Sequence, residues 1–254
     1  MNGPEASVEF RDVSYRLPDG REILHALNLE VRRGEILVLL GRSGSGKTTA
    51  LKLVNRLLEA SSGDLLIEGR AAREWDVIKL RRHIGYAIQD VGLFPHYTVS
   101  RNIGLVPAIE QWPAERIEAR VQELVKLVGL NADIGRRYPH QLSGGQRQRV
   151  GVARALAADP PILIMDEPFG ALDPLTRSDL QREFLSLQKQ LGKTVLFVTH
   201  DLHEALLLGT RIALLEEGRL VSLSPPQEFL DSSDALVQKY VQAFSAAEQV
   251  RGGK

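Results

Sequence analysis

A glycine-rich stretch of the chain carries the residue types that bind phosphate. The stretch GRSGSGKT begins at Gly41, follows an apolar run and matches the spacing G-x-x-x-x-G-K-[ST]. Gly44 and Gly46 let the backbone curl so that its amides point inward at an anion. Lys47 supplies a positive charge for the terminal phosphates, and the Thr48 hydroxyl can ligate Mg²⁺. An ordinary turn before a helix is the alternative interpretation.

Two acids follow a second apolar run. In ILIMDE, four apolar residues predict a buried strand, and Asp166 and Glu167 stand at its end, where α/β sheets bind ligands. We expect Asp166 to hold Mg²⁺ through water. Glu167 is expected to position or deprotonate a water in line with the terminal phosphate. Alone, the two acids could equally cap the next turn, but beside the glycine-rich stretch they favour a nucleotide site.

A third motif, QLSGGQRQRVGVARALAADP, places two glycines at the head of a predicted helix. Adjacent glycines start helices poorly, because each loses extra backbone freedom on folding. Ser143 and Gln146 have capping-box spacing, so Ser143 can fix the helix start. A capped surface helix therefore explains Ser143 and Gln146, but it leaves Gly144 and Gly145 unexplained.

The composition narrows the class of protein. A quarter of the 254 residues are charged, and 32 Lys plus Arg balance 32 Asp plus Glu. This neutral total argues weakly against nucleic-acid binding, for which a basic face is usual. The chain has no cysteine, which excludes disulfides and thiolate metal sites and fits a reducing compartment. No signal-peptide pattern and no apolar run near the ~20 residues of a membrane span is present, so we expect another chain to do any spanning.

Strands alternate with helices along the chain, which predicts an α/β core with a mostly parallel sheet. Residues 8–40 read as strands with turns at Pro18-Asp19-Gly20 and Arg33-Gly34. Further strands are expected at 35–41, 65–69, 162–166, 194–199 and, as a hairpin turning near Gly218, 211–224. Helices are expected at 76–83, from Pro113 to about 128, at 174–191 and in the C-terminal tail. The stretch 85–158 has few strand signals and is expected to be a helical insert.

With these motifs in place, the sequence resembles the nucleotide-binding subunits of ATP-binding-cassette (ABC) transporters over about residues 8–230. The most specific mark is LSGGQ, residues 142–146, which matches the family's signature motif. The resemblance implies the ABC ATPase fold, with a P-loop NTPase core, an antiparallel β subdomain and a helical insert. It also implies that two cassettes stack head to tail, each signature closing over the ATP of the other. Gly144 and Gly145 would then bring their amides close to the γ-phosphate, which the helix dipole favours.

The resemblance implies roles for residues elsewhere in the chain. Tyr15 would stack on adenine, with a half-buried strand tyrosine as the alternative. Gln89, in YAIQD, would sense Mg²⁺ and the attacking water, and His200 would contact the γ-phosphate. Asp173, in GALD, would link the two sites across the dimer. Many relatives have serine where Gly170 stands, so one hydroxyl contact would be missing here.

The expected cofactors are ATP and Mg²⁺. The catalytic residues would be Glu167, His200 and Gln89, and the Mg²⁺ ligands would be Thr48, Gln89 and Asp166. The residues expected to bind nucleotide are Tyr15, Gly41, Arg42, Ser43, Gly44, Ser45, Gly46, Lys47, Thr48, Thr49, Ser143, Gly144, Gly145, Gln146 and Asp173. The order of His200, His203 and Glu204 fits neither zinc pattern of a helix, so His203 is expected to be an ordinary helix residue.

We expect a single ABC ATPase domain over residues 1–240. Its nucleotide-binding core would comprise 1–88 and 159–240, its helical subdomain 89–158, and a tail 241–254. Many similar proteins append a pair of regulatory domains that respond to ionic strength. The printed chain ends at Lys254, and we expect no such pair to follow.

Two long stretches, IGYAIQDVGLFPHYTVSRNIGLVP and RYPHQLSGGQRQRVGVARALAADPPILIMDEPFGALDPLTR, look like the cassettes of osmoprotectant importers. That resemblance implies an ATP hydrolase at the cytoplasmic face of the membrane that powers import of glycine betaine, choline or similar solutes. The expected partners are a second, identical cassette, integral-membrane permease subunits and, indirectly, an external solute-binding protein; no nucleic acid is expected. The alternatives are an ABC ATPase of another importer or exporter, a cassette acting on nucleic acid, and a binding-only cassette.

The stretch VGLFPHY, residues 91–97, is expected to help form the dock for the membrane subunits. Leu93 and Phe94 are apolar and lie among turn residues just after Gln89. An exposed apolar patch there would be a partner site. Packing of Phe94 into the core of the helical subdomain is the alternative.

Overall fold

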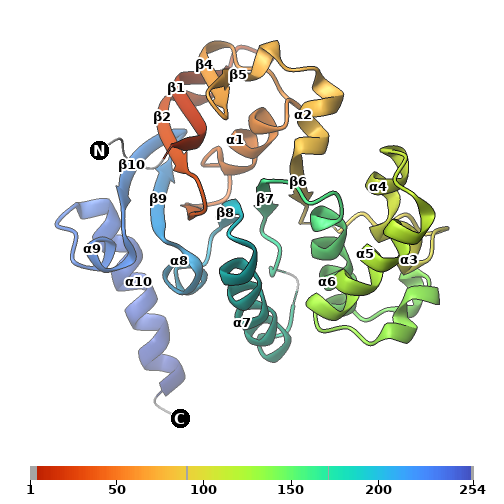
Figure 1. Cartoon of the computed structure of the whole chain (residues 1–254). Helices are drawn as coiled ribbons and strands as arrows, with labels where there is room; N and C mark the ends of the chain where they lie inside the picture. Colours follow the sequence, from red (N-terminus) through yellow and green to blue (C-terminus); the bar gives the residue numbers. More distant parts are fainter. Residues whose placement is uncertain (1–4, 90, 171, 253–254) are drawn as a thin grey trace. The chain divides into compact units, whose positions relative to one another are not determined.

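Two compact units make up the chain (Figure 1). Unit 1 holds Met1–Trp75 and Thr194–Lys254, and unit 2 holds Asp76–Lys193. The structure is a computed structural model that describes residues 5–89, 91–170 and 172–252, the last eight by their backbone alone. Asp90 of the YAIQD stretch, Ala171 of the GALD stretch and the last two residues of the tail lie outside the described residues.

Unit 1 begins with an antiparallel sheet whose strand order is β2-β1-β4-β5 (Figure 1). β1 and β2 form a long hairpin, in which Val8 pairs with Val31 and Phe10 with Leu29. All four of these side chains are buried, so the hairpin packs one apolar face inward. The antiparallel part of the expected fold is thereby confirmed. The strands are β1 (Ala6–Arg16), β2 (Glu22–Arg32), β4 (Ser62–Ile67) and β5 (Arg70–Ala71).

The second sheet region of unit 1 is built around β3 (Ile36–Leu40). β3 pairs in parallel with both β8 (Thr194–Thr199) and β9 (Arg211–Glu216), and all five of its residues are buried. A central parallel strand is covered on both faces, which explains its continuous apolar sequence. β10 (Arg219–Ser224) returns antiparallel to β9 after the predicted turn at Gly218. The helices of this unit are α1 (Lys47–Val54), η1 (Ala72–Glu74), α8 (Leu202–Leu208), α9 (Pro226–Leu230) and α10 (Ala235–Gly252).

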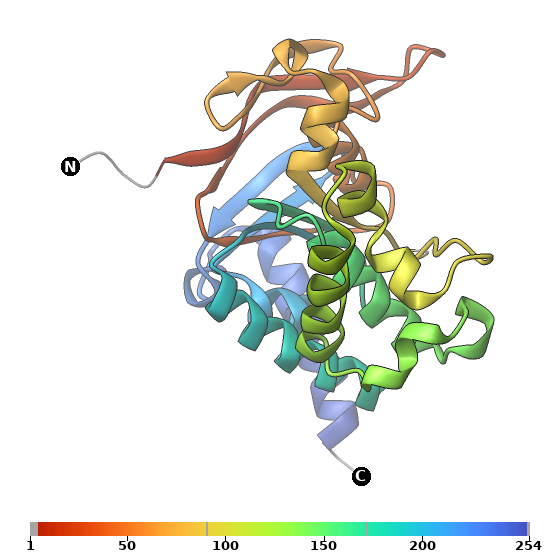
Figure 2. The same ribbon diagram turned by 45° about the vertical axis from the view of Figure 1, so that its right-hand side comes forward.

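Unit 2 is mainly helical, and α6 packs against both α5 and α7 (Figure 2). Val121, Leu124 and Val125 of α5 are buried, as the predicted helical spacing requires. The helices are α2 (Val77–His83), α3 (Val99–Ile103), α4 (Leu105–Ile109), α5 (Ala114–Leu127), η2 (Ala132–Arg136), η3 (Pro139–Gln141), α6 (Gly144–Leu156) and α7 (Pro174–Leu191).

The expected helical insert at 85–158 contains a strand at its start, which corrects that boundary. β6 (Ile84–Ala87) pairs in parallel with β7 (Ile162–Asp166). Glycine is a poor strand residue, and Gly85 weakened the sequence signal. A Cβ on Gly85 would lie 2.3 Å from the Ala155 carbonyl oxygen, so close packing against α6 requires glycine in this strand.

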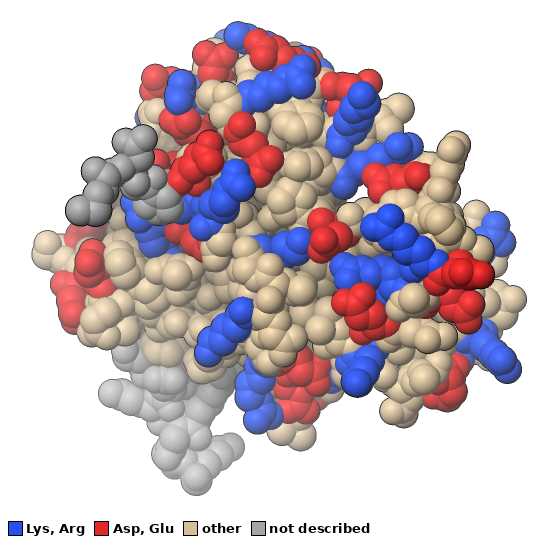
Figure 3. Space-filling view, viewed as in Figure 1, with Lys and Arg blue, Asp and Glu red and all other residues tan. Residues whose placement is uncertain are grey.

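Charged side chains of both signs are interspersed on the face drawn in Figure 3, in line with the balanced totals. The ion pair between Arg211 and Glu35 is buried: the two side chains meet at 2.7 Å and are 11% and 9% exposed. Within the residues that the structure describes, no helix is both long and apolar enough to cross a bilayer.

Candidate nucleotide-binding site

The residues that the sequence assigns to nucleotide chemistry are distributed over both units. Unit 1 carries Tyr15, the loop from Gly41 to Thr49, and His200. Unit 2 carries Gln89, the signature residues Ser143–Gln146, the acids Asp166 and Glu167, and Asp173.

The phosphate loop of unit 1 leads from β3 into α1 and folds around a lysine. Gly44 and Gly46 have φ angles of 84° and 98°, in the left-handed region that glycine adopts without strain. Lys47 is 5% exposed, and its Nζ donates hydrogen bonds to the carbonyl oxygens of Gly41 and Arg42, both at 2.7 Å. An anion that enters this loop would therefore meet a positive charge already held in place.

Packing explains two of the loop's glycines. A Cβ on Gly41 would lie 2.3 Å from the Leu215 carbonyl oxygen, and one on Gly46 would lie 2.6 Å from a leucine methyl group of β2. A Cβ on Gly44 would meet nothing within 4 Å, so its left-handed backbone is the reason for glycine there. Ser45 Oγ is buried and has no hydrogen-bond partner within the described part of the chain. A loop with a fixed lysine and an unsatisfied buried hydroxyl fits a bound phosphate group.

His200 leaves the sheet beside the phosphate loop. Leu40 pairs with Thr199 on the parallel strands β3 and β8, so the residues that follow them, Gly41 and His200, emerge side by side. Thr199 Oγ1 donates a hydrogen bond of 2.6 Å to the buried Glu204 on α8. His200 itself is exposed. The register thus places two of the predicted site residues at one edge of unit 1.

Tyr15 lies on β1, where it pairs with Leu24 of β2. The Leu24 side chain is the one that approaches Gly46 of the phosphate loop. Tyr15 is half-buried, which agrees with either interpretation of this residue. Its stacking on adenine stays a prediction.

The corresponding edge of unit 2 carries Asp166 and Gln89. Ala87 pairs with Met165 on the parallel strands β6 and β7, so both chains leave the sheet together. Asp166 is 6% exposed, and Gln89 is exposed. Burial and the charge of Asp166 raise the pKa of Tyr86 to about 12, so this phenol stays neutral beside the acid.

Glu167 has a left-handed backbone, with a φ angle of 43°. This conformation costs a residue with a side chain roughly 1–2 kcal/mol, so the surrounding contacts must hold it. The Gly170 amide donates to the Glu167 carbonyl oxygen at 3.1 Å, and Gln148 Nε2 donates to the Pro168 carbonyl oxygen. Gln148 is buried on α6, and no local sequence signal marks it, because its partner lies 20 residues away in the chain.

The signature helix α6 begins with the predicted capping box. Ser143 Oγ accepts a hydrogen bond from the Gln146 amide at 3.2 Å, and Gln146 Oε1 accepts one from the Ser143 amide at 3.0 Å. The two glycines that follow differ from each other. A Cβ on Gly145 would lie 2.6 Å from Thr176 Cγ2 of α7, whereas one on Gly144 would meet nothing within 4 Å. Packing against α7 therefore gives a reason for glycine at position 145 that the capping box alone does not, and none for Gly144.

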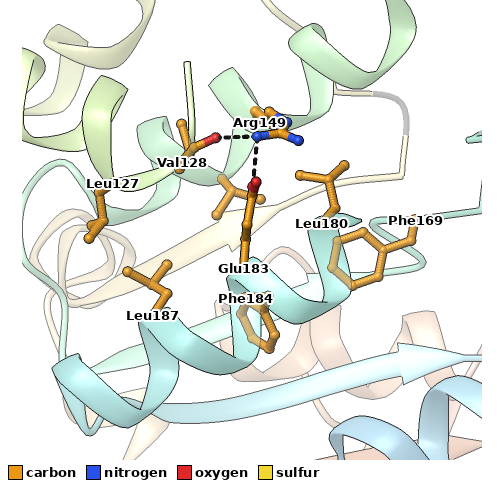
Figure 4. A pocket seen from close by; sticks show the side chains of 9 residues that line it. Leu127, Val128, Arg149, Phe169, Leu180, Glu183, Phe184 and Leu187 are labelled. Carbon is orange, nitrogen blue, oxygen red and sulfur yellow. Dashed lines mark hydrogen bonds and ion pairs between the residues drawn. The ribbon is translucent and has the colours of Figure 1, made fainter. Parts of the chain in front are cut away.

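A second contact joins α6 to α7 one helical turn further along (Figure 4). Arg149 forms an ion pair with Glu183 at 2.7 Å and donates to the Val128 carbonyl oxygen at 2.9 Å. Gly129 makes room for this arginine, because a Cβ there would lie 2.5 Å from the guanidinium. The pair borders a small apolar pocket lined by Leu127, Val152, Phe169, Leu180, Phe184 and Leu187. The orientation of the signature helix is thus set from both α5 and α7.

Asp173 caps α7, and its Oδ1 accepts a hydrogen bond from the Thr176 amide at 3.1 Å. Hydrogen bonds from the Thr176 side chain and amide hold the pKa of Asp173 below its usual value, so it is charged at neutral pH. Asp173 is exposed, and the neighbouring Leu175 is 80% exposed. The role of Asp173 between two active sites stays a prediction.

The loop at 93–98 is held by a buried asparagine. Asn102 is fully buried; its Oδ1 accepts from the Phe94 amide at 2.8 Å, and its Nδ2 donates to the carbonyl oxygens of Phe94, Tyr97 and Thr98. The Phe94 ring nevertheless remains 42% exposed and lies against the rings of His96 and Tyr97. The alternative that Phe94 fills the subdomain core is therefore wrong.

His203 is an exposed residue of α8, and its ring stacks on Phe244 of α10. Over the described residues, no group of three or more His, Asp and Glu side chains could by itself hold a metal ion.

Comparison with known proteins identifies the family. The family model described as "ABC transporter" matches residues 24–170, more than half of the chain. The chain belongs to the ABC transporter family. The matched segment contains the phosphate loop, the signature motif, Asp166 at the end of β7 and Glu167 just after it.

Several curated ABC transporter proteins are similar over most of the chain. The glycine betaine/carnitine/choline transport ATP-binding protein OpuCA of Bacillus subtilis is 46% identical over 243 residues, which are 96% of this chain and 63% of that protein. The glycine betaine uptake system ATP-binding protein YehX of Escherichia coli is 50% identical over 223 residues, 88% of this chain and 72% of that protein. The chain thus spans about two thirds of the length of these relatives.

Solved structures of ABC cassettes share the fold. CbiO1 of Clostridium perfringens, part of the CbiONQ transporter complex, has a TM-score of 0.84 at 28% identity, covering 98% of this chain and 99% of that one. The cassette MJ0796, dimeric and bound to ADP and Pi in a post-hydrolysis state, has a TM-score of 0.77 at 33% identity, covering 86% and 98%. The expected ABC ATPase fold is confirmed.

Proposed function

We propose that this chain binds and hydrolyses ATP as the cassette subunit of an importer for quaternary-amine osmoprotectants such as glycine betaine and choline. The observation that carries ATP binding is the phosphate loop, in which Lys47 is buried and fixed by two backbone carbonyls. The solute class rests on the relatives, whose names include glycine betaine, carnitine and choline transport.

In this proposal the loop receives the phosphates of ATP. Lys47 exchanges its carbonyl partners for phosphate oxygens, and the amides around Gly44 and the start of α1 add further donors. Mg²⁺ would be held by Thr48, Asp166 and Gln89, whose oxygen atoms suit this hard cation, and it would neutralise charge on the phosphates. Adenine would stack on Tyr15.

Glu167 would orient or deprotonate the attacking water, and His200 would contact the γ-phosphate. The left-handed backbone of Glu167 supports this role, because strained conformations gather at functional sites. Hydrolysis would therefore depend on residues at the carboxyl ends of parallel strands, where such sheets bind ligands.

A second copy of the chain would complete the site. Ser143 and Gly144 stand at the start of α6, exposed and without a neighbour to block the approach to Gly144. Amides at a helix start attract phosphate, so the signature of one copy would close over the ATP of the other. ATP contacts present only in the closed state would drive closure, and their loss on hydrolysis would reopen the pair.

The permease subunits would dock at the loop around Phe94, from the cytoplasmic face of the membrane. Asn102 fixes the backbone of this loop while the Phe94 ring stays exposed. An exposed aromatic residue on a rigid loop is typical of an interface anchor.

Hydrolysis is tested with the purified chain and Mg·ATP. The wild type should release phosphate, and Glu167→Gln should lose most of that activity while still binding ATP. Glu228→Gln, at an exposed glutamate of α9, is the matched control and should behave as the wild type. Full activity in Glu167→Gln would contradict the assignment of Glu167. Stimulation by DNA or RNA would favour the nucleic-acid alternative.

The solute is tested separately, by uptake of labelled glycine betaine and choline in cells with the intact gene and with the Lys47→Ala gene. Uptake should depend on the intact gene. Equal uptake, together with loss of some unrelated solute, would reject the solute class and leave ATP hydrolysis standing.

A further inference from the structure

A buried glutamate on α8 has no role in the site described so far. Glu204 is 3% exposed and lies on the buried face of α8, the helix that packs against β3 and β8. Glutamate is rarely buried without a partner, because taking its carboxylate out of water is costly. Glu204 Oε2 accepts a hydrogen bond from the Thr199 hydroxyl at 2.6 Å, within the range for a hydroxyl that donates to a carboxylate.

The Thr199 hydroxyl makes a second hydrogen bond. Its Oγ1 accepts from the Asp201 amide at 3.0 Å. An amide can only donate, and a hydroxyl carries one proton, so that proton is directed at Glu204 and a lone pair at Asp201. Thr199 is 1% exposed, so little water can replace either partner. Glu204 thereby orients the hydroxyl for its bond to the Asp201 amide.

These hydrogen bonds enclose His200. The bond from the Asp201 amide back to the Thr199 hydroxyl closes a turn of three residues with His200 in the middle. A second turn follows directly, because Asp201 Oδ1 accepts from the His203 amide at 2.8 Å and caps α8. His200 is thus an exposed residue between a buried strand end and a capped helix start. Its backbone is held from both sides.

The turn at His200 starts beside the phosphate loop. Thr199 pairs with Leu40, the last residue of β3, and Gly41 of the loop follows Leu40. A change in the turn would therefore alter the distance between the imidazole and a phosphate held in the loop. Misplacement of a catalytic group by about 1 Å can cost much of its effect.

From these contacts we propose that Thr199, with its hydroxyl oriented by Glu204, is a positioning residue that holds His200 at the γ-phosphate. The inference rests on the proposed function and adds two residues to it. Without the hydroxyl, the Asp201 amide loses its acceptor and the turn at His200 loosens. ATP would still bind to the phosphate loop, but the imidazole would contact the γ-phosphate for a smaller fraction of the time.

The test is ATP hydrolysis by the purified full-length chain, measured together with binding of a fluorescent ATP analogue. Thr199→Val keeps the shape of the side chain and removes the hydroxyl, so kcat should fall about 2- to 10-fold, the range expected for one hydrogen bond. KM and the dissociation constant of the analogue should stay close to the wild-type values. Thr199→Ser keeps the hydroxyl and should retain most of kcat. Glu204→Met removes the carboxylate, fills its space and should lower kcat as Thr199→Val does.

Thr194→Val, at the opposite end of β8, is the matched control. Thr194 is also buried, and its hydroxyl also has two partners, the Gly34 amide at 3.0 Å and the Ser7 hydroxyl at 3.1 Å. Thr194→Val should lower the unfolding midpoint about as much as Thr199→Val and leave kcat unchanged. Equal loss of kcat in both valine variants, or wild-type kcat in Thr199→Val, would overturn the proposal.

The same change in a His200→Ala background separates positioning from a structural role. His200→Ala should lower kcat about 100-fold. Adding Thr199→Val should cause no further loss in single-turnover assays with excess enzyme, because the group to be positioned is gone. A further loss as large as in the wild-type background would overturn the proposal. Full activity in His200→Ala would instead refute the proposed contact of His200 with the γ-phosphate, and this inference with it.

Discussion

The two glycine-rich segments of this protein differ in how their residues are used. In the phosphate loop, Lys47 is buried against the loop's own carbonyls, and the space beside Gly41 and Gly46 is filled by the same unit. At the signature, Ser143 is exposed and the space beside Gly144 is open. Residues of unit 1 thus hold the phosphate loop in place. Ser143 and Gly144 of the signature, by contrast, are open to solvent and can be approached by another molecule.

This difference shows that a glycine can be required for two different reasons. A glycine with a filled neighbouring space is needed for folding, and a side chain there costs stability. A glycine with open space and ordinary backbone angles can accept a side chain in the folded monomer. Its requirement must then come from the approach of another molecule, which the proposed second copy supplies for Gly144.

Lys47→Ala, in the phosphate loop, should have the largest effect of the variants compared. It removes the charge and both hydrogen bonds to the loop carbonyls, so ATPase activity of the complete transporter should fall by about 100-fold or more. Lys52→Ala, on the same helix, should retain most activity. Normal ATP hydrolysis by Lys47→Ala would contradict the assignment of residues 41–48 as a phosphate-binding loop.

Ser143→Arg, made in the Glu167→Gln background, tests the signature side. Glu167→Gln should retain ATP and run as a dimer in size-exclusion chromatography with ATP, and as a monomer without it. The added arginine should abolish the dimer, because its side chain would occupy the space that the γ-phosphate needs. Ser186→Arg, at another exposed serine of unit 2, should leave the dimer intact. An ATP-dependent dimer that ignores the Ser143 change would refute closure by the signature.

Asn102→Ala tests whether the exposed loop around Phe94 depends on its hydrogen bonds to the buried Asn102 side chain. The change leaves the Phe94 amide and three carbonyl oxygens without their partner, so unfolding in urea should show a loss of about 2–3 kcal/mol. Phe94→Ala should instead cost little stability and weaken coupling to the permease subunits. If Asn102→Ala were as stable as the exposed control Asn131→Ala, the loop would have another support.

The smallest effect is expected from the two signature glycines, compared by thermal unfolding of the monomer. Gly145→Ala should destabilise by about 1 kcal/mol, because the new methyl group clashes with Thr176. Gly144→Ala should be neutral or slightly stabilising. Thr176→Ser should restore the stability of Gly145→Ala by removing the methyl group it meets. Equal destabilisation by both alanines would remove the distinction between the two glycines.

Local patterns were sufficient to predict much of this molecule. The continuous apolar run at 35–41 predicted β3, Pro174 and the following spacing predicted α7, and Ser143 with Gln146 predicted the cap of α6. Each of these features depends on residues close together in the chain. The positions of Tyr15, Gln89 and His200 came from the family resemblance, and their chemical roles remain predictions.

The sequence could not predict features whose partners are distant in the chain. Gln148 supports the turn after Glu167, Arg149 forms an ion pair with Glu183, and Tyr240 donates to Glu216. None of these pairs has a local signal in the sequence. β6 was not predicted because Gly85 weakens its strand pattern. Glycine is required at that position because the Ala155 carbonyl oxygen of α6 leaves no room for a Cβ. Tertiary packing decided each case.

The left-handed backbone of Glu167 has a consequence for how this protein would evolve under artificial selection. Glycine, and to a lesser degree asparagine, adopts a φ angle near 43° more easily than glutamate does. A laboratory selection for heat resistance alone would therefore favour Gly or Asn at position 167, and under the proposed role of Glu167 the more stable chains would lose ATP hydrolysis. Selection for transport would favour glutamate instead. The sequence with the highest stability and the sequence with the highest transport activity would then differ at this residue.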